Sequence, residues 1–304
     1  MTEHMDRAQL GEVELAYALR GSGEPVVLVH WGISAAWSRP LLEAPALSGY
    51  RLLSYHRAGF GRSSRPQGPL TLADHAAHCR QLMRQVGIER AHIVGHSSSA
   101  AIVLQLALDC PDAVHTLVLM DAARPAPPTE TQSDFVRNFV QPAVQRYRAG
   151  DTRAAVDTFL RCVFGPDYRA ALEQGLPGAF EHAVADADAF FGQELPALQQ
   201  WSFTHEDARR IDQPALVVLG ENSVSTFPER RELLLSWLPN AEPFDLPGAT
   251  HLLHVQNAEG MARALAAFCA RHPVVQHRPR AIRPGDDRDD APGRARTALG
   301  YWSS

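Results

Sequence analysis

Short apolar runs alternate with longer amphipathic stretches through the first 123 residues. Five runs have the length and composition of strands: 13–18, 25–30, 51–55, 91–94 and 116–120. Three stretches carry apolar residues at helical spacing: 37–47, 71–86 and 98–108. Strands that alternate with helices predict an α/β fold with a doubly wound, mostly parallel sheet. Ligands of such sheets bind at the carboxyl ends of the strands.

The pattern changes after residue 123. Residues 124–210 contain helical patterns and no strand-like alternation, and the helices predicted there are 135–148, 151–163, 167–174 and 178–195. Strand and helix patterns then return, with strands at 214–219 and 242–246 and helices at 229–238 and 258–271. We therefore expect a core formed by residues 1–123 and 211–272, interrupted by a helical insertion at 124–210. The composition of residues 273–304, rich in Pro, Arg, Asp and Gly, predicts a disordered tail.

One junction in the first half carries candidate chemistry. The buried strand 91–94 breaks at Gly95 and His96, Ser97 stands at the break, and a buried helix follows. A strand, a sharp turn with Ser at its apex and a helix form the context of the G-x-S-x-G nucleophile elbow. Gly95 fits this motif, whereas Ser99 stands at the position of the second Gly. The same residues could also form a polar helix N-cap. Motifs elsewhere in the chain are needed to distinguish the two interpretations.

Composition narrows the class of protein. The 304 residues, 45% hydrophobic and 21% charged, are enough for a large core with an insertion. The formal net charge is −5, which makes nucleic acid and anionic membranes poor candidates as partners. No apolar run is long enough to span a bilayer, and residues 1–11 lack the apolar segment of a signal peptide. We expect a cytoplasmic protein that acts on a small molecule, and homo-oligomerisation is left open.

The residue inventory also excludes several chemistries. All 29 basic residues are Arg, so no Lys can act as a nucleophile or form a Schiff base. The four Cys residues are scattered and predict neither a disulfide framework nor a zinc site. His251 and His254 lack the third ligand and the motif of a metal pair. We expect no metal and no cofactor.

Four segments together resemble the α/β-hydrolase fold superfamily. They read Val-Leu-Val-His-Trp-Gly-Ile at 27–33, Tyr-His-Arg-Ala-Gly-Phe-Gly-Arg-Ser at 55–63, Gly-His-Ser-Ser-Ser at 95–99 and Gly-Ala-Thr-His at 248–251. Their order and spacing cover residues 12 to 272. The resemblance implies that residues 124–210 form a helical cap and that Ser97 is the nucleophile. Dehalogenases and epoxide hydrolases of this fold need Asp at the elbow, so Ser97 argues against those activities.

A serine hydroxyl needs a base and a site that stabilises the oxyanion. His251 is the predicted base, in the chain order that this fold uses, with His254 as the fallback. The backbone N–H of Ser98, at the start of a helix, is one predicted oxyanion donor. Gly32 is the other, with Trp31 as the alternative. Trp31 is expected either to wall the acyl pocket or to pack in the core.

The third member of the triad is an acid that orients the imidazole. The resembling family usually places it after strand 214–219, in a Gly-x-x-Asp pattern, but this chain has Ser223 there. Asp121, which ends strand 116–120, is the predicted acid, and Glu221 is the alternative; an acid elsewhere, or none, stays open. His56 and Arg57 are expected to form a hydrogen-bonded pair that organises their loop.

These residues predict a serine hydrolase that works through an acyl-enzyme. The expected substrate is a small ester, thioester, lactone, amide or activated carbon–carbon bond. Because the usual acid position is occupied by Ser223, the alternative is a degenerate hydrolase that binds a small molecule without efficient turnover. A third interpretation is a lyase or a cofactor-free peroxidase that uses the same residues.

Overall fold

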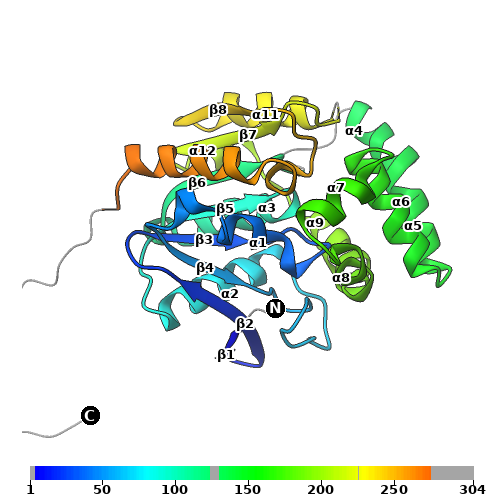
Figure 1. Cartoon of the computed structure of the whole chain (residues 1–304), viewed down its shortest axis with the longest axis horizontal. Helices are drawn as coiled ribbons and strands as arrows, with labels where there is room; N and C mark the ends of the chain where they lie inside the picture. The colour runs from blue at the N-terminus through cyan, green and yellow to red at the C-terminus, as the bar shows by residue number, and fades with distance from the viewer. Residues whose placement is uncertain (1–3, 124–129, 225, 275–304) are drawn as a thin grey trace, which may run out of the picture. The chain divides into compact units, whose positions relative to one another are not determined.

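The computed structural model describes residues 4–123, 130–224 and 226–274, and its framework is an eight-stranded sheet flanked by helices (Figure 1). The order of strands across the sheet is β1-β2-β4-β3-β5-β6-β7-β8. Their bounds are β1 Asp6–Leu10, β2 Val13–Arg20, β3 Pro25–Val29, β4 Arg51–Tyr55, β5 Ala91–His96, β6 Val114–Met120, β7 Ala215–Gly220 and β8 Ala241–Leu246. All neighbouring pairs from β4 to β8 are parallel, while β1 and β2 are added antiparallel at one edge. The predicted fold class is confirmed.

Strand β1 was not predicted, because its sequence is mostly polar. Only Ala8 and Leu10 of β1 are buried, and they alternate with exposed residues as in an edge strand with one covered face. Gly11 follows with φ +62°, the left-handed conformation that a tight hairpin requires and glycine adopts without strain.

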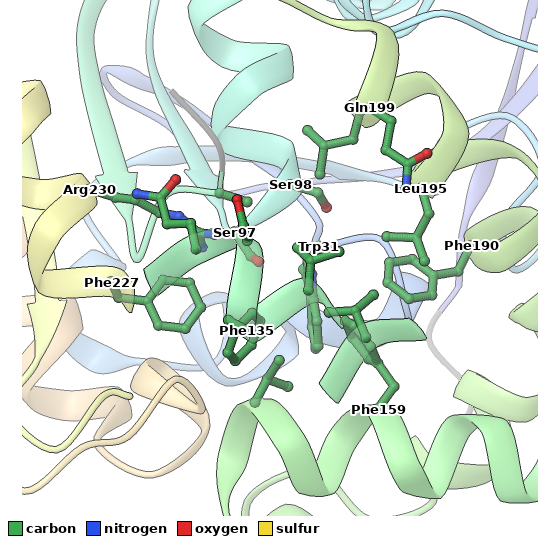
Figure 2. Close-up of a pocket in the computed structure, with 17 residues that line it drawn as sticks. Trp31, Ser97, Ser98, Phe135, Phe159, Phe190, Leu195, Gln199, Phe227 and Arg230 are labelled. Atoms are coloured by element: carbon green, nitrogen blue, oxygen red, sulfur yellow. The ribbon is translucent and has the colours of Figure 1, made fainter. Parts of the chain in front are cut away.

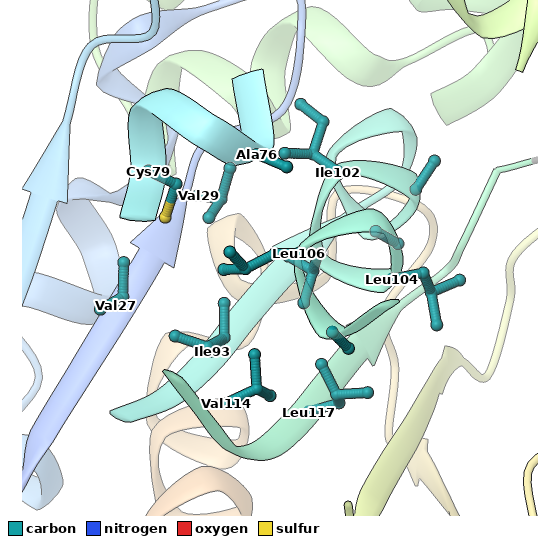
Figure 3. Close-up of a cluster of buried hydrophobic side chains, with 14 of the residues drawn as sticks. Val27, Val29, Ala76, Cys79, Ile93, Ile102, Leu104, Leu106, Val114 and Leu117 are labelled. Carbon is teal, nitrogen blue, oxygen red and sulfur yellow. The ribbon is translucent and has the colours of Figure 1, made fainter. Parts of the chain in front are cut away.

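The central strands bury both faces, which explains their continuous apolar sequences. On one face, Val27 and Val29 pack with α2 (Leu72–Gln85) and α3 (Ser98–Asp109), as Figure 3 shows. On the other face, Val26 and Leu28 belong to a cluster with α1 (Arg39–Leu42) and α12 (Ala258–Arg271). Successive side chains of a strand point to opposite faces, so each of these strands contributes to two cores.

The helix predicted for residues 37–47 is wrong. The segment folds as a 3₁₀ turn at Ala35–Ser38, the single-turn α1 and a second 3₁₀ turn at Pro45–Leu47. Pro45 has no N–H to continue a helix, and it favours extended backbone in the preceding residue. Ala44 accordingly has φ −75° and ψ 124°.

A helical segment separates β6 from β7, with the bounds α4 Glu130–Phe135, α5 Gln141–Arg148, α6 Thr152–Phe164, α7 Tyr168–Gly175, α8 Ala179–Ala185, α9 Leu195–Gln200 and α10 His205–Ala208. The predicted helices 135–148 and 178–195 are not regular, because π-helical stretches at Val136–Val140 and Asp188–Glu194 interrupt them. Several of these helices gather at one end of the sheet in Figure 1. Their apolar faces form one cluster with Trp31 and Trp37 of the core.

The rest of the chain completes the parallel sheet. Helix α11 (Thr226–Trp237) connects β7 to β8, and short 3₁₀ turns occur at Pro111–Ala113 and Leu253–Val255. The predicted helix 229–238 therefore begins three residues earlier than expected. Of the predicted tail, residues 275–304 lie outside the described residues, as do residues 124–129 at the start of the predicted insertion.

Candidate active site

Ser97 occupies a strained turn between β5 and α3. Its backbone has φ +55° and ψ −118°, a conformation that costs a non-glycine residue about 1–3 kcal/mol. Two hydrogen bonds hold it there: the Ser97 N–H donates to the Met120 carbonyl (2.9 Å), and the Ala123 N–H donates to the Ser97 carbonyl (3.0 Å). The neighbouring strand β6 thus holds the turn in place at the carboxyl edge of the sheet.

The turn is possible because strand and helix approach closely. A Cβ atom on Gly95 would lie 2.6 Å from the Val103 side chain and 2.8 Å from the Ser99 carbonyl oxygen, so only glycine fits. Ser99 stands at the position of the second Gly, and its hydroxyl forms hydrogen bonds with the backbone. That oxygen accepts the His96 N–H (2.8 Å) and lies 2.9 Å from the Val29 carbonyl oxygen, to which it can donate. The side chain therefore joins β3 to the turn.

Asp121 and His251 meet at the same edge of the sheet. Asp121 follows β6 directly, and its Oδ2 lies 2.9 Å from Nδ1 of His251, in the loop after β8. Both side chains are fully buried. A carboxylate only accepts hydrogen bonds, so Nδ1 carries the hydrogen and Nε2 is left with its lone pair. Among the described residues Nε2 has no hydrogen-bond partner, the Ser97 hydroxyl included.

The Asp121 carboxylate has two further donors. The Gly220 N–H donates to Oδ1 (3.1 Å), and the Ser223 hydroxyl donates to Oδ2 (2.5 Å). The alternative acid, Glu221, is exposed and accepts the Gly248 N–H instead (2.7 Å). Of the two predicted acids, the structure brings only Asp121 to His251.

Two residues of α11 lie next to His251, and neither is predicted as a site residue from the sequence. The Phe227 ring stacks on the imidazole with a centroid distance of 4.1 Å and an interplanar angle of 14°. Arg230 lies one helical turn further along α11, and its positive charge disfavours protonation of the imidazole. The pKa of His251 is lowered, first by burial and also by Arg230, while Asp121 opposes the shift. A neutral imidazole is the form that can accept a proton. No local motif marks either residue; only the return of α11 over the loop reveals them.

His96 and His254 are held by Trp37. The indole N–H donates to Nδ1 of His96 (2.7 Å), and Nε2 of His254 donates to the Trp37 carbonyl (2.9 Å). Burial lowers the pKa of His254 to about 4 and that of His96 well below its usual value. Both are therefore neutral near pH 7. His254, the fallback base, is thus oriented toward Trp37.

Gly32 lies against the buried ion pair between Glu194 and Arg57, which joins the helical segment to the core. A Cβ atom on Gly32 would lie 2.1 Å from Oε1 of Glu194, so the close approach requires glycine. The Glu194 carboxylate accepts a 2.5 Å hydrogen bond from Nη2 of Arg57, and both side chains are completely buried. His56 does not pair with Arg57; its Nδ1 accepts the Arg62 N–H (2.8 Å). The expected His56–Arg57 pair is therefore wrong, because each residue has a different partner.

A cavity of about 430 Å³ opens beside the elbow and is lined mostly by apolar side chains. Figure 2 shows Phe227 and Arg230 on one side of Ser97, and Trp31, Phe159 and Phe190 on the other. Ser98, Gln132, Ser133 and Gln199 also line the cavity. This volume and lining are typical of sites for small organic molecules.

The described residues contain neither a candidate metal site nor a candidate membrane-spanning helix. Within residues 4–123, 130–224 and 226–274, no group of three or more His, Cys, Asp or Glu side chains is placed to hold a metal ion. In the same residues, no helix has both the length and the apolar composition required to cross a membrane.

The fold and this site define a protein of the α/β-hydrolase class. The sequence model of the alpha/beta hydrolase fold family matches residues 24–258, and the chain belongs to that family. The chain is 28% identical over 244 residues to a putative carbamate hydrolase RutD of Klebsiella pneumoniae, covering 78% of this chain and 88% of that relative. It is 33% identical over 298 residues to a fluoroacetate dehalogenase of a Burkholderia species, covering 85% and 91%.

Solved structures agree with this fold. The structure of an enol-lactonase from Burkholderia xenovorans superposes with a TM-score of 0.76 at 22% identity, covering 87% of this chain and all of that one. An esterase from Thermogutta terrifontis gives a TM-score of 0.76 at 19% identity, covering 89% of this chain and all of that one. At these identities the likeness concerns the fold alone.

Proposed function

We propose that the protein is a serine hydrolase that cleaves a small carbonyl substrate through an acyl-enzyme. Ser97 is the nucleophile, His251 the general base and Asp121 the residue that orients His251. The observation that carries this proposal is the 2.9 Å contact between Asp121 and Nδ1 of His251. It leaves the Nε2 lone pair available as the base for a serine at the same sheet edge.

The proposed reaction has two halves. Ser97 Oγ attacks the substrate carbonyl carbon while Nε2 of His251 takes the hydroxyl proton and then returns it to the leaving group. The backbone N–H groups of Gly32 and Ser98 stabilise the oxyanion, the latter at the positive end of α3. Water activated by His251 then releases the acid. Hydrogen bonds between nucleophile and base are often long in the free enzyme and shorten when substrate binds.

We also propose that the helical insertion, residues 124–210, acts as a cap on a core formed by residues 1–123 and 211–272. The cap supplies Phe159 and Phe190 to the cavity wall, while the core supplies Ser97. The buried pair between Glu194 of the insertion and Arg57 of the core fixes the two against each other. A cap of this kind limits the size of the substrate that can enter the cavity.

The identity of the nucleophile separates this proposal from dehalogenation. The Burkholderia relative is named for action on fluoroacetate. Dehalogenases of this fold need an Asp at the elbow, and this chain has Ser97. We expect ester hydrolysis and no release of fluoride from fluoroacetate, measured with a fluoride electrode.

A fluorophosphonate probe tests the nucleophile directly. We expect covalent labelling of the wild-type protein at Ser97, located by mass spectrometry of the peptides, and no labelling of Ser97→Ala or His251→Ala. Ser236→Ala, which removes an exposed hydroxyl on α11, is the matched control and should label normally. Failure to label the wild type, or labelling that survives in Ser97→Ala, would contradict the proposal.

A further inference from the structure

The active-site cavity contains a buried positive charge that hydrolysis of a neutral ester does not need. Arg230 is the one formally charged side chain among the described residues that line the cavity, and only 6% of it is exposed. The other lining residues are apolar, hydroxyl or amide side chains. Guanidinium groups are rarely buried this deeply without a role in binding or structure.

Local packing fixes where this charge lies. Arg230 and Phe227 are one turn apart on α11, and the guanidinium carbon is 5.3 Å from the Phe227 ring centroid. Phe227 in turn stacks on His251. In Figure 2, Arg230 enters the cavity from the same side as Phe227, next to Ser97. The cation therefore lies on the same side of the cavity as Phe227, the residue that stacks on the proposed base.

A cation in this place affects the positive charge that catalysis puts on His251. His251 becomes positively charged when it takes the Ser97 proton, and a neighbouring guanidinium disfavours that charge. Arg230 is one of the groups that lower the pKa of His251. A substrate that brings a negative charge to Arg230 offsets this effect and gains a charge-assisted hydrogen bond, which a planar guanidinium can form in bidentate geometry with a carboxylate.

We propose that Arg230 recognises a carboxylate on the substrate, so that the preferred substrates are carbonyl compounds with a small apolar body and an anionic end. This inference rests on the proposed hydrolase function and deepens it. The apolar wall formed by Trp31, Phe159 and Phe190 holds the body of the substrate, while Arg230 holds its charge next to Ser97.

Matched ester pairs test the charge preference. The probes are monomethyl esters of malonic, succinic, glutaric and adipic acid, each compared with the analogue whose free carboxylate is replaced by a neutral primary amide. Hydrolysis is followed by methanol release. We expect one chain length at which the wild type prefers the anion, and a fall of at least about ten-fold in the anion-to-amide ratio of kcat/KM in Arg230→Gln. Arg230→Lys, which retains the charge, should keep part of the preference.

A binding measurement separates this inference from the proposed function. In Ser97→Ala, which cannot form an acyl-enzyme, calorimetry should show tighter binding of the monomethyl dicarboxylates than of their amides. The preference should disappear in the double variant Ser97→Ala with Arg230→Gln. If this binding pattern holds but the wild type hydrolyses no ester, the hydrolase proposal fails and the carboxylate site stands.

Two outcomes would overturn the carboxylate site. One is equal kcat/KM for anion and amide at every chain length, accompanied by equal binding. The other is a loss in Arg230→Gln that is the same for both members of each pair, because a purely structural role lowers both equally. Arg230→Met, which retains the apolar stem, gives a second neutral variant if the glutamine variant unfolds, and thermal melts of each variant establish that it folds.

Discussion

The Ser223 hydroxyl donates a 2.5 Å hydrogen bond to the same Asp121 oxygen that faces Nδ1 of His251. Ser223 occupies the position at which the resembling family usually carries its acid. The two positions are neighbours because β6 and β7 pair in parallel, with Met120 opposite Val218. An acid at the end of β6 can therefore reach the same imidazole, with the residue at the usual position serving as its hydrogen-bond donor.

This arrangement predicts different effects of amide substitutions at the two candidate acids. Asp121→Asn should lower kcat about 10⁴-fold, because the amide no longer favours the Nδ1–H tautomer or stabilises the imidazolium. Glu221→Gln should leave kcat unchanged, since Glu221 contacts the Gly248 N–H. Steady-state kinetics on a reporter ester measure both, with circular dichroism as the folding control. Equal losses in the two variants would contradict the assignment of the acid.

The buried pair between Arg57 and Glu194 predicts a strong coupling in stability. Glu194→Met should lower the free energy of unfolding by about 3–5 kcal/mol, because it leaves the Arg57 guanidinium buried without its partner. The double variant Arg57→Met with Glu194→Met should recover most of that loss. Urea denaturation of the two single variants and the double variant gives the coupling energy. Additive losses would show that the pair does not act as a unit.

The histidines buried in neutral form predict sensitivity to acid. His254 has a pKa of about 4 in the folded protein, against about 6.5 in the unfolded chain. The unfolded chain therefore binds a proton first as the pH falls. The stability associated with His254 is complete above pH 6.5 and is lost between pH 6.5 and about 4, at a cost of roughly 3 kcal/mol.

His254→Gln isolates this contribution. The glutamine amide can still donate to the Trp37 carbonyl, but it does not titrate. We expect the free energy of unfolding of the variant to fall less steeply than that of the wild type from pH 6.5 to pH 4, and to differ from it by a constant offset above pH 7. Parallel curves across the whole range would contradict the assigned pKa.

The hydrogen bonds of the Ser99 hydroxyl predict that restoring the usual Gly at this position lowers the stability of the fold. Ser99→Gly removes the hydroxyl that accepts the His96 N–H, and it should lower the free energy of unfolding by about 1–3 kcal/mol, with a lower Tm. Ser99→Ala removes the same hydroxyl without adding backbone freedom, so it should shift Tm in the same direction. Both variants should still be labelled by the fluorophosphonate. A higher Tm for Ser99→Gly would show that the hydroxyl contributes nothing.

Local patterns in the sequence determined the fold class and the position of the elbow. Continuous apolar runs between amphipathic helices predict a parallel sheet, because strands covered on both faces need apolar residues throughout. The small residues around Ser97 mark the elbow, since the turn depends on neighbours along the chain. The polar β1 and the helix broken at Pro45 were missed, because in each case one or two residues outweigh the average pattern.

Only the tertiary structure decided which residues surround the imidazole. Asp121 and His251 are 130 positions apart, and the register of β6 against β7, together with the loop after β8, brings them within 2.9 Å. Phe227, Arg230 and Glu194 carry no local motif; α11 and the helical insertion deliver them when they pack on the core. Contacts between distant segments depend on how whole elements pack, and a one-dimensional pattern of apolar and polar residues does not encode which side chains then meet.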